Sequence, residues 1–277
     1  MNTFQNRCLK NALACASLVF AALLPLAAHA GRSCEARPTT VQTVERGLAL
    51  AAKTLASLNA SGADVVFIAR NGQDLSRYGV RYSHMGIAYR VPATADLPAT
   101  WRVLHKLNDC GTSTAALYRQ GLGEFFLDDL WRFEAAWVAP TPEAQSRLGA
   151  LLRDPQASIA LNHKPYSIVS YAWGQKYQQS NQWAIETVAS AMEPSIDSRA
   201  KAQAWLQFKG YEPAVLKLGP LTRLGGRMTS ANVAFDDHPN DKRFSDRIET
   251  VTVDSVFNWL PRAQLVPPGV VPVVVKL

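Results

Sequence analysis

The sequence lacks the features that assign a chain to several large protein classes. After residue 30 it has no apolar run long enough to cross a membrane, and it has no internal repeat or low-complexity segment. Its lysines and arginines are scattered and form no basic run, although the formal net charge is +7. Because a basic patch is the footprint of nucleic-acid binding, we expect no nucleic-acid partner.

Spacings typical of metal sites are also missing. After residue 30 the histidines are His84, His105, His163 and His238, and none belongs to an H-E-x-x-H or C-x-x-C pattern. The acidic stretch DDHPND lacks the glycine and the closing glutamate of a calcium-binding loop. We therefore expect neither a metal nor another cofactor.

The first thirty residues have the pattern of a secretory signal peptide. Arg7 and Lys10 precede an apolar stretch, which ends at the small-x-small sequence Ala28-His29-Ala30. The expected mature chain is Gly31–Leu277, a single domain that is periplasmic or secreted and has no transmembrane segment. Its partner would be a small molecule, a peptide or a lipid.

Cysteine is scarce in the expected mature chain. Cys8 and Cys15 lie in the signal peptide, which leaves Cys34 and Cys110. In an oxidising compartment these two are expected to form a disulfide, with a stabilisation of about 2–4 kcal/mol. The alternative is that Cys110 is a nucleophile, because it precedes a segment that we predict as a short helix.

Hydrophobic periodicity predicts an α+β fold, with an antiparallel sheet of five or six strands packed by helices. Polar residues interrupt the pattern at 155–179. The last sixty residues are predicted to alternate short strands with turns and to finish in an edge strand, because prolines disfavour central strands. Strands are predicted at 64–70, from His84, at 101–108 and at 131–139, and helices at 41–58, 112–122, 142–153, 180–192 and 198–209. The buried face of the first helix is predicted to be Val41, Val44, Leu48, Ala51, Leu55 and Leu58.

The stretch YSHMGIAYR, residues 82–90, places a histidine at the start of an apolar strand, beside the small residues Gly86 and Ala88. His84 is either a hydrogen-bonded core residue or part of an active site. We expect the small residues to let the helix at 180–192 pack closely and present its N-terminus to the imidazole.

Two further polar positions fit a site for nucleophilic catalysis. His105 lies on the next predicted strand, and Ser180 and Asn181 open an apolar helix. A helix N-terminus offers N–H groups and positive potential to an oxyanion, while one imidazole takes a proton and a second polar group orients it. The alternatives are that His105 lies on the strand surface and that Ser180 simply caps the helix.

Several segments resemble a known family when taken in order: DVVFIARNGQDLSRYGVRYSHMGIAYR, WRVLHKLNDCGTS, LYRQGLGEFF and YQQSNQW. They resemble the uncharacterised bacterial secreted family called domain of unknown function 2145, over about residues 34–260. That family is in turn similar to circularly permuted NlpC-type papain-like hydrolases. The resemblance implies a papain-like fold in which His84 is the general base and His105 orients it.

The same resemblance places Ser180 where papain-like hydrolases carry the nucleophilic cysteine. Asn181 and Trp183, just after it, would contact substrate, although Trp183 fits the core better than a substrate contact. A serine cannot form the stable thiolate–imidazolium pair of a cysteine enzyme and needs a neutral imidazole as base. The expected activity is hydrolysis of an amide or ester in a peptide, a cell-wall cross-link or an acyl lipid. The alternatives are a non-catalytic periplasmic binding or accessory protein and a structural domain with a buried histidine.

Overall fold

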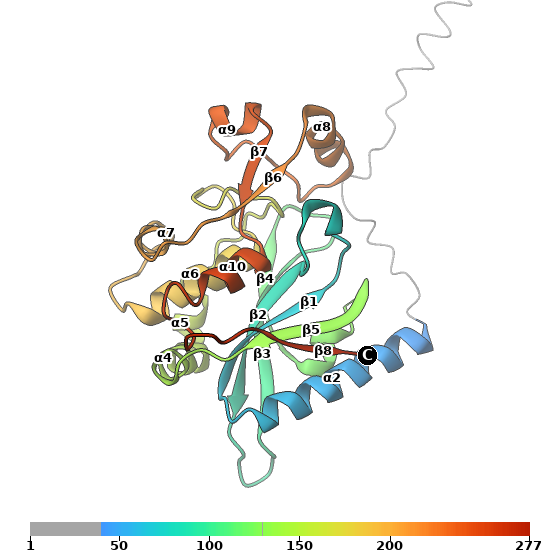
Figure 1. Ribbon diagram of the computed structural model, residues 1–277, viewed down its shortest axis with the longest axis vertical. Coiled ribbons are helices and arrows are strands. Elements are labelled where there is room, and N and C mark those ends of the chain that lie inside the picture. The colour runs from blue at the N-terminus through green and yellow to red at the C-terminus, as the bar shows by residue number, and fades with distance from the viewer. Residues whose placement is uncertain (1–39, 129) are drawn as a thin grey trace, which may run out of the picture.

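The computed structural model describes residues 40–128 and 130–277, with a six-stranded sheet at its centre (Figure 1). Neighbouring strands are all antiparallel, in the order β4-β3-β2-β1-β5-β8, which confirms the predicted α+β fold with an antiparallel sheet. Strands β6 and β7 form a second, two-stranded sheet. The strands are β1 (Val65–Asn71), β2 (His84–Val91), β3 (Thr100–Asn108), β4 (Ala115–Gly121), β5 (Arg132–Val138), β6 (Ala214–Lys217), β7 (Arg247–Thr250) and β8 (Val273–Lys276).

Helices cover both faces of the six-stranded sheet. One face packs against α2 and α3, and the other against α4, α6 and α10 (Figure 1). Strand β1 is therefore buried along its whole length. The helices are α2 (Val41–Ala60), the 3₁₀ turn η1 (Ser76–Tyr78), α3 (Leu122–Phe126), α4 (Pro142–Arg153), α5 (Pro155–Ile159), α6 (Ser180–Met192), α7 (Arg199–Phe208), α8 (Pro220–Thr229), α9 (Asn240–Phe244) and α10 (Val253–Trp259).

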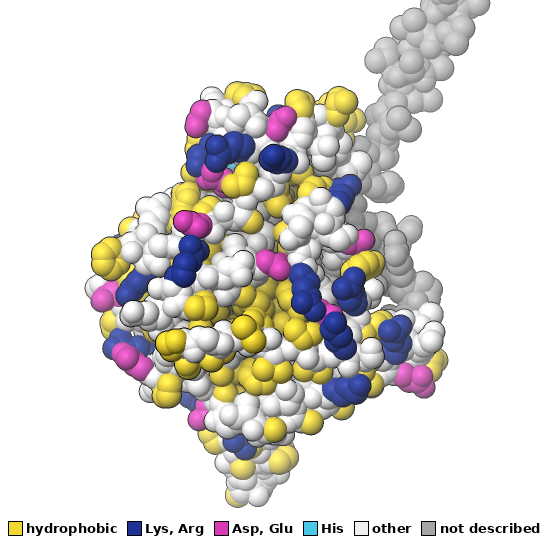
Figure 2. Space-filling model, in the orientation of Figure 1, with side chains coloured by type: hydrophobic (Ala, Val, Ile, Leu, Met, Phe, Trp, Pro, Cys, Tyr) yellow, Lys and Arg dark blue, Asp and Glu magenta, His cyan; other side chains and the backbone are white. Residues whose placement is uncertain are grey.

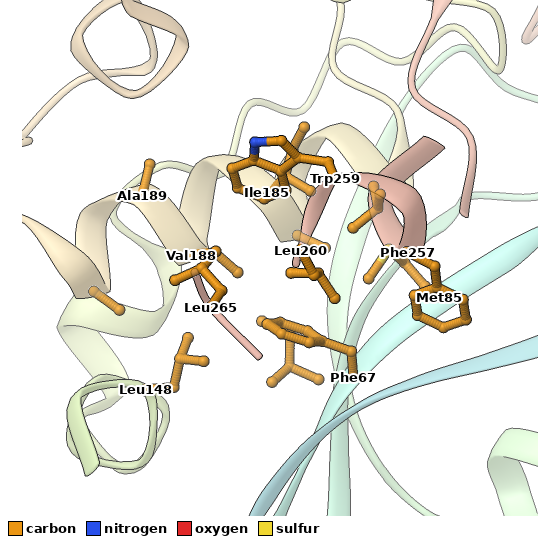
Figure 3. Close-up of a cluster of buried hydrophobic side chains, with 14 of the residues drawn as sticks. Phe67, Met85, Leu148, Ile185, Val188, Ala189, Phe257, Trp259, Leu260 and Leu265 are labelled. Carbon is orange, nitrogen blue, oxygen red and sulfur yellow. The ribbon is translucent and has the colours of Figure 1, made fainter. Parts of the chain in front are cut away.

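The core on the α6 face fixes this helix against the sheet. Phe67 of β1 and Met85 of β2 belong to one buried cluster with Ile185 and Val188 of α6 and Trp259 of α10 (Figure 3). Burial of each such side chain contributes roughly 1.5–3 kcal/mol. The start of α6 is consequently held at a defined place beside the end of the sheet.

Helix capping defines where two of the predicted helices begin. Thr40 caps α2, and Thr141 caps α4 with Pro142 as its first residue. Both α4 and α6 have their predicted bounds. Gly210 follows α7 with a φ of 70°, a left-handed conformation that glycine adopts without strain.

The buried face of α2 differs from the predicted one. Val41, Leu48 and Leu55 are exposed, and the buried positions are Gly47, Leu50, Ala51, Thr54 and Leu58. A Cβ atom on Gly47 would lie 2.9 Å from the carbonyl oxygen of Phe126. The absence of a side chain at Gly47 lets α3 approach the backbone of α2, and the face that contains Gly47 is the buried one.

The predicted helix at 112–122 was wrong. Residues 115–121 form β4, which pairs with β3 from Asn108↔Ala115 to Arg102↔Gly121, and a helix begins only at Leu122. Asp109, Thr112 and Thr114 bond to one another in the connecting loop. Hairpin pairing with a buried neighbouring strand thus overrides the local preference of TSTAAL.

The C-terminal region was also predicted incorrectly in part. It contains the helices α8, α9 and α10 besides short strands. Thr252 and Ser255 form a reciprocal capping pair at the start of α10, a signal that the strand interpretation overlooked. The final strand, β8, lies at an edge of the sheet as expected.

Two predictions fall on residues 1–39, which are outside the described residues: the signal peptide and the position of Cys34. The pairing of Cys34 with Cys110 therefore stays a prediction. Within residues 40–128 and 130–277, no helix is both long and apolar enough to span a bilayer.

Candidate active site

A cavity of about 770 Å³ lies where the end of the central sheet meets the start of α6. His84 of β2 and Ser180 of α6 both line it. Apolar side chains from the neighbouring loops and from β6, including Ile168, Val169 and Leu216, line another part of it. The cavity thus combines ionisable and hydroxyl groups with an apolar wall.

His84 and His105 are hydrogen-bonded to each other. Nε2 of His84 lies 2.9 Å from Nδ1 of His105, and Nε2 of His105 lies 2.8 Å from Oε1 of Gln120 on β4. The three side chains form a chain across β2, β3 and β4. His105 is fully buried, so it is not on the strand surface.

The end of this chain determines the tautomer of each imidazole. An amide oxygen only accepts hydrogen bonds, so Nε2 of His105 is protonated and its N–H donates a hydrogen bond to Oε1 of Gln120. Nδ1 of a neutral His105 must then accept from Nε2–H of His84. His84 is left with an unprotonated Nδ1, the atom that a general base requires.

Burial keeps both imidazoles neutral. It is the main cause that lowers the pKa of His84 well below its ordinary value, and the nearby Arg70 and His105 lower it further. Burial and then Arg70 lower the pKa of His105 to about 4. Arg70 is itself buried at the end of β1 and bonds to the carbonyl of Phe125 and to Asp128.

Ser180 is the first residue of α6 but does not cap it, so the capping interpretation was wrong. The N-cap is Gln179, whose side chain accepts from the N–H of Asn181 at 3.1 Å. The Ser180 hydroxyl instead lies 3.5 Å from the hydroxyl of Tyr166. It is thereby available to the cavity at a helix N-terminus.

Tyr166 was not predicted as a site residue. Its backbone N–H donates to the carbonyl of Ser113 at 2.7 Å, which ties the 166 loop to the β3–β4 connection. Burial raises the pKa of its phenol, so the hydroxyl stays protonated and can donate a hydrogen bond. It lines the cavity beside Ser180.

Asn181 lines the cavity, but its side chain also ties α6 to the sheet. Oδ1 accepts from the N–H of Met85 at 3.1 Å, and Nδ2 donates to the carbonyl of Val251 at 3.3 Å. Trp183 is fully buried in the core cluster and is not part of the cavity lining. The predicted substrate contact for Trp183 is therefore replaced by a packing role.

Comparison with known proteins supplies one match. A family model described as "Uncharacterized protein conserved in bacteria (DUF2145)" matches residues 57–260, most of the chain. The chain belongs to the DUF2145 family. Searches of curated proteins and of solved structures gave no match. The relationship to NlpC-type hydrolases is therefore not shown by these comparisons.

In this DUF2145 protein, the two parts of the site come from opposite faces of the sheet. The rings of His84 and His105 contact Phe125 of α3, with centroids 6.1 Å and 5.2 Å away. Met85, the next residue, packs in the cluster that contains α6. Within the described residues no hydrogen bond joins Ser180 to His84, although both line the cavity.

The expected role of the small residues beside His84 was wrong. A Cβ atom on Gly86 would lie 2.6 Å from Cγ1 of Val103 and 3.0 Å from Cβ of His105. Gly86 therefore makes room for β3 and for His105, and Ala88 packs on the α2 face. The side of β2 that meets α6 carries Met85, Ile87 and Tyr89.

The remaining candidate, Cys110 as a nucleophile, gains no support from the geometry of this DUF2145 site. Cys110 lines the cavity, but the segment after it is strand β4, so no helix N-terminus is present there to activate a thiol. Among the residues that the structure describes, no group of three His, Cys, Asp or Glu side chains is arranged to hold a metal ion.

Proposed function

We propose that this protein is an exported hydrolase of amide or ester bonds, with Ser180 as nucleophile and His84 as general base. We further propose that its fold is a circularly permuted, NlpC-type papain-like fold, as the resemblance of the motifs suggests. One observation carries the proposal: a serine hydroxyl released from helix capping and a neutral imidazole with a free acceptor nitrogen line one cavity.

The protonation state of His84 suits a serine nucleophile. A serine hydroxyl must lose its proton during attack, so its base has to be neutral beforehand. The low pKa of His84 provides a neutral base across the physiological range. A thiolate–imidazolium pair would require a charged His84, which burial and the Arg70 guanidinium oppose. Serine in the cysteine position and a neutral histidine are thus mutually consistent.

The reaction would proceed in two acyl-transfer steps. The Ser180 oxygen attacks the substrate carbonyl while its proton passes to Nδ1 of His84, and the same proton then leaves with the amine or alcohol. Water, deprotonated by His84, then attacks the acyl carbon, and the proton returns from His84 to the Ser180 oxygen as the acid leaves. The oxyanion would lie at the α6 N-terminus, where the Tyr166 hydroxyl and the first-turn N–H groups other than that of Asn181, which donates to Gln179, can donate to it.

The substrate would present an apolar group on one side of the scissile bond. Ile168, Val169, Leu216 and Leu218 line the cavity on one side. Such a wall suits an acyl chain or an apolar peptide side chain better than a sugar. The candidates remain a peptide, a cell-wall cross-link and an acyl lipid.

A non-catalytic binding protein is the second candidate. The observation that favours it is the missing hydrogen bond between Ser180 and His84 in the described structure. In a hydrolase this hydrogen bond would form when substrate is bound, because catalytic hydrogen bonds often tighten only in the complex. A binding protein would keep the cavity and show no chemistry at Ser180.

The deciding experiment measures hydrolysis of p-nitrophenyl esters of increasing chain length by the chain Gly31–Leu277. We expect Ser180→Ala and His84→Gln each to lower kcat by about 10²–10⁴-fold, the usual contribution of positioned acid–base groups. Ser195→Ala, on an exposed turn, is the matched control and should leave the rate unchanged. Activity should persist below pH 6.5, because the lowered pKa keeps His84 neutral there.

The opposite result is equally clear. If the parent chain and both variants hydrolyse every ester at the same background rate, Ser180 is not a nucleophile. Retained binding of an apolar dye, lost on Leu216→Asp, would then support the binding protein.

A further inference from the structure

Helices α8 and α9 stand with β6 and β7 at one extremity of the molecule (Figure 1). Neither helix contains a buried residue. A small cluster of Leu218, Phe235 and Ile248 holds the two-stranded sheet beneath them. Arg223 of α8 bonds to Asp246 and to the carbonyl of Leu218, so α8 is held in place from its polar side.

The outer side of α8 is apolar. Leu221 is 84% exposed, and Leu224 and Met228 are more than half exposed. The spacings of three and four residues place the three on one face of the helix. Phe244 of α9 is 69% exposed. We call these four side chains the apolar tip.

A cluster of exposed apolar side chains on a protein surface often marks a site where a partner binds. Among the described residues, no hydrophobic cluster includes any member of the apolar tip. Figure 2 shows hydrophobic side chains at this end of the molecule, with basic and acidic side chains close to them. The covering partner therefore has to offer an apolar region.

The segment that contains α8 has a net positive charge. Residues 214–229 contain three basic residues and no acidic one, whereas residues 230–250 contain three basic residues and five acidic ones. Arg227 is exposed on the flank of the apolar face of α8, where its stem can follow the apolar surface and its charge can reach headgroups. This is the pattern of a helix that lies in the plane of a membrane interface.

We propose that the apolar tip docks this protein on an anionic lipid surface. The apolar tip lies at one extremity of the molecule, where a flat surface can reach it (Figure 1). Thr229 and Ser230, which follow the apolar face of α8, line the cavity. Docking would therefore bring the cavity close to the lipids. The membrane binding itself does not depend on the proposed hydrolase activity.

The test is sedimentation of the chain Gly31–Leu277 with vesicles of phosphatidylglycerol and phosphatidylethanolamine, compared with vesicles of phosphatidylcholine alone. We expect binding to the anionic vesicles that falls at least about tenfold in the variant Leu221→Ser/Leu224→Ser/Met228→Ser, since each loses apolar burial in the bilayer. Arg227→Glu should weaken binding mainly at low salt.

Two controls keep the experiment decisive. None of the three substituted side chains is buried, so the thermal transition of the variant should match the parent. The variant Leu97→Ser/Phe208→Ser/Val271→Ser removes three other exposed apolar side chains and should bind vesicles like the parent.

Several outcomes would overturn the proposal. They are no binding by the parent, equal binding by the α8 variant, and equal binding to neutral vesicles. A parent dimer that the α8 substitutions convert to a monomer, without any binding to vesicles, would assign the apolar tip to a second copy of the chain.

Discussion

His105 and Lys106 are neighbours on β3, yet they belong to two buried polar clusters on opposite faces of the sheet. His105 is in the neutral chain His84–His105–Gln120, which ends at the cavity. Lys106 is in an ionic cluster beside α6, in which Gln178 links it to Glu186 and Arg199. We call the first the histidine chain and the second the ionic cluster.

The ionic cluster is closed. Glu186 accepts from Arg199 at 2.8 Å, from Gln203 at 2.8 Å and from Gln178. Lys106 donates to Gln178 at 2.7 Å and to the carbonyl of His163. Each charged group thus has several partners within the protein, and none of these side chains lines the cavity.

The histidine chain, in contrast, is open at one end. Gln120 fixes the tautomer of His105, which fixes that of His84, and Nδ1 of His84 remains as an acceptor. This difference between the two clusters indicates which buried polar network can take part in a reaction. A network whose partners all belong to the chain supports the fold, and one that ends at a cavity leaves a polar atom for a substrate.

The largest effect is expected from breaking the ionic cluster at Glu186. In Glu186→Ala the Arg199 guanidinium remains buried without its carboxylate, a loss that costs about 3–5 kcal/mol of unfolding free energy. Urea denaturation measures it. Glu143→Ala, which removes an exposed pair with Arg147, should cost less than about 1 kcal/mol. Equal losses in both variants would show that the cluster is not closed as described.

A smaller effect, on activity and not on stability, is expected from the far end of the histidine chain. Gln120→Leu removes the acceptor that fixes the His105 tautomer, and we expect kcat to fall about 10–100-fold, the range found for residues that orient metal-bound histidines. Gln120→Glu keeps an acceptor oxygen and should retain most activity at pH 8. The acidic limb of the pH–rate profile of Gln120→Glu should move to higher pH, because a carboxylate raises the pKa of His105.

Ester hydrolysis across pH 5–9 provides this comparison. If Gln120→Leu and Gln120→Glu have the same profile as the parent, the amide does not control the tautomer. The hydrogen bonds that join His84, His105 and Gln120 would then not contribute to catalysis.

The sequence predicts those parts of the fold that depend on local signals. The cap Thr141 with Pro142 defines α4, and the apolar pattern from 180 to 192 defines α6. Alternation also places His84 and His105 on neighbouring strands. These signals lie within one turn or one strand of the residues that they position, so they can be interpreted without tertiary contacts.

The rest of the site depends on tertiary contacts. Gln120 was missed because residues 112–122 resemble a helix, and only pairing with β3 places it opposite Val103 and next to His105. Tyr166 lies in a stretch without periodicity, and its position comes from hydrogen bonds to the β3–β4 connection. The cap at Gln179 was missed because serine is the stronger capping residue in isolation.

The smallest expected effect is on the pH dependence of the free energy of unfolding, which should differ between the two clusters. Burial, and then Arg199, lower the pKa of Lys106 from 10.5 to about 7. Between pH 7 and pH 9 the unfolded chain therefore binds a proton at this lysine that the folded chain lacks. Stability should rise with pH in this window by up to ~1.4 kcal/mol per pH unit. Lys106→Met should remove this slope, and Lys201→Met, at an exposed site, should keep it.

The histidine chain should change the stability of the fold at acidic pH instead. Its folded imidazoles stay neutral below pH 6.5, where the unfolded histidines take up protons, so stability should fall as the pH is lowered from there. Urea denaturation of the parent, Lys106→Met and His84→Gln at intervals from pH 5 to pH 9 measures both slopes. If Lys106→Met keeps the parent's slope above pH 7, Lys106 is charged in the folded protein. The ionic cluster would then hold a buried ammonium group with Gln178 and the His163 carbonyl as its acceptors, while the histidine chain stays neutral.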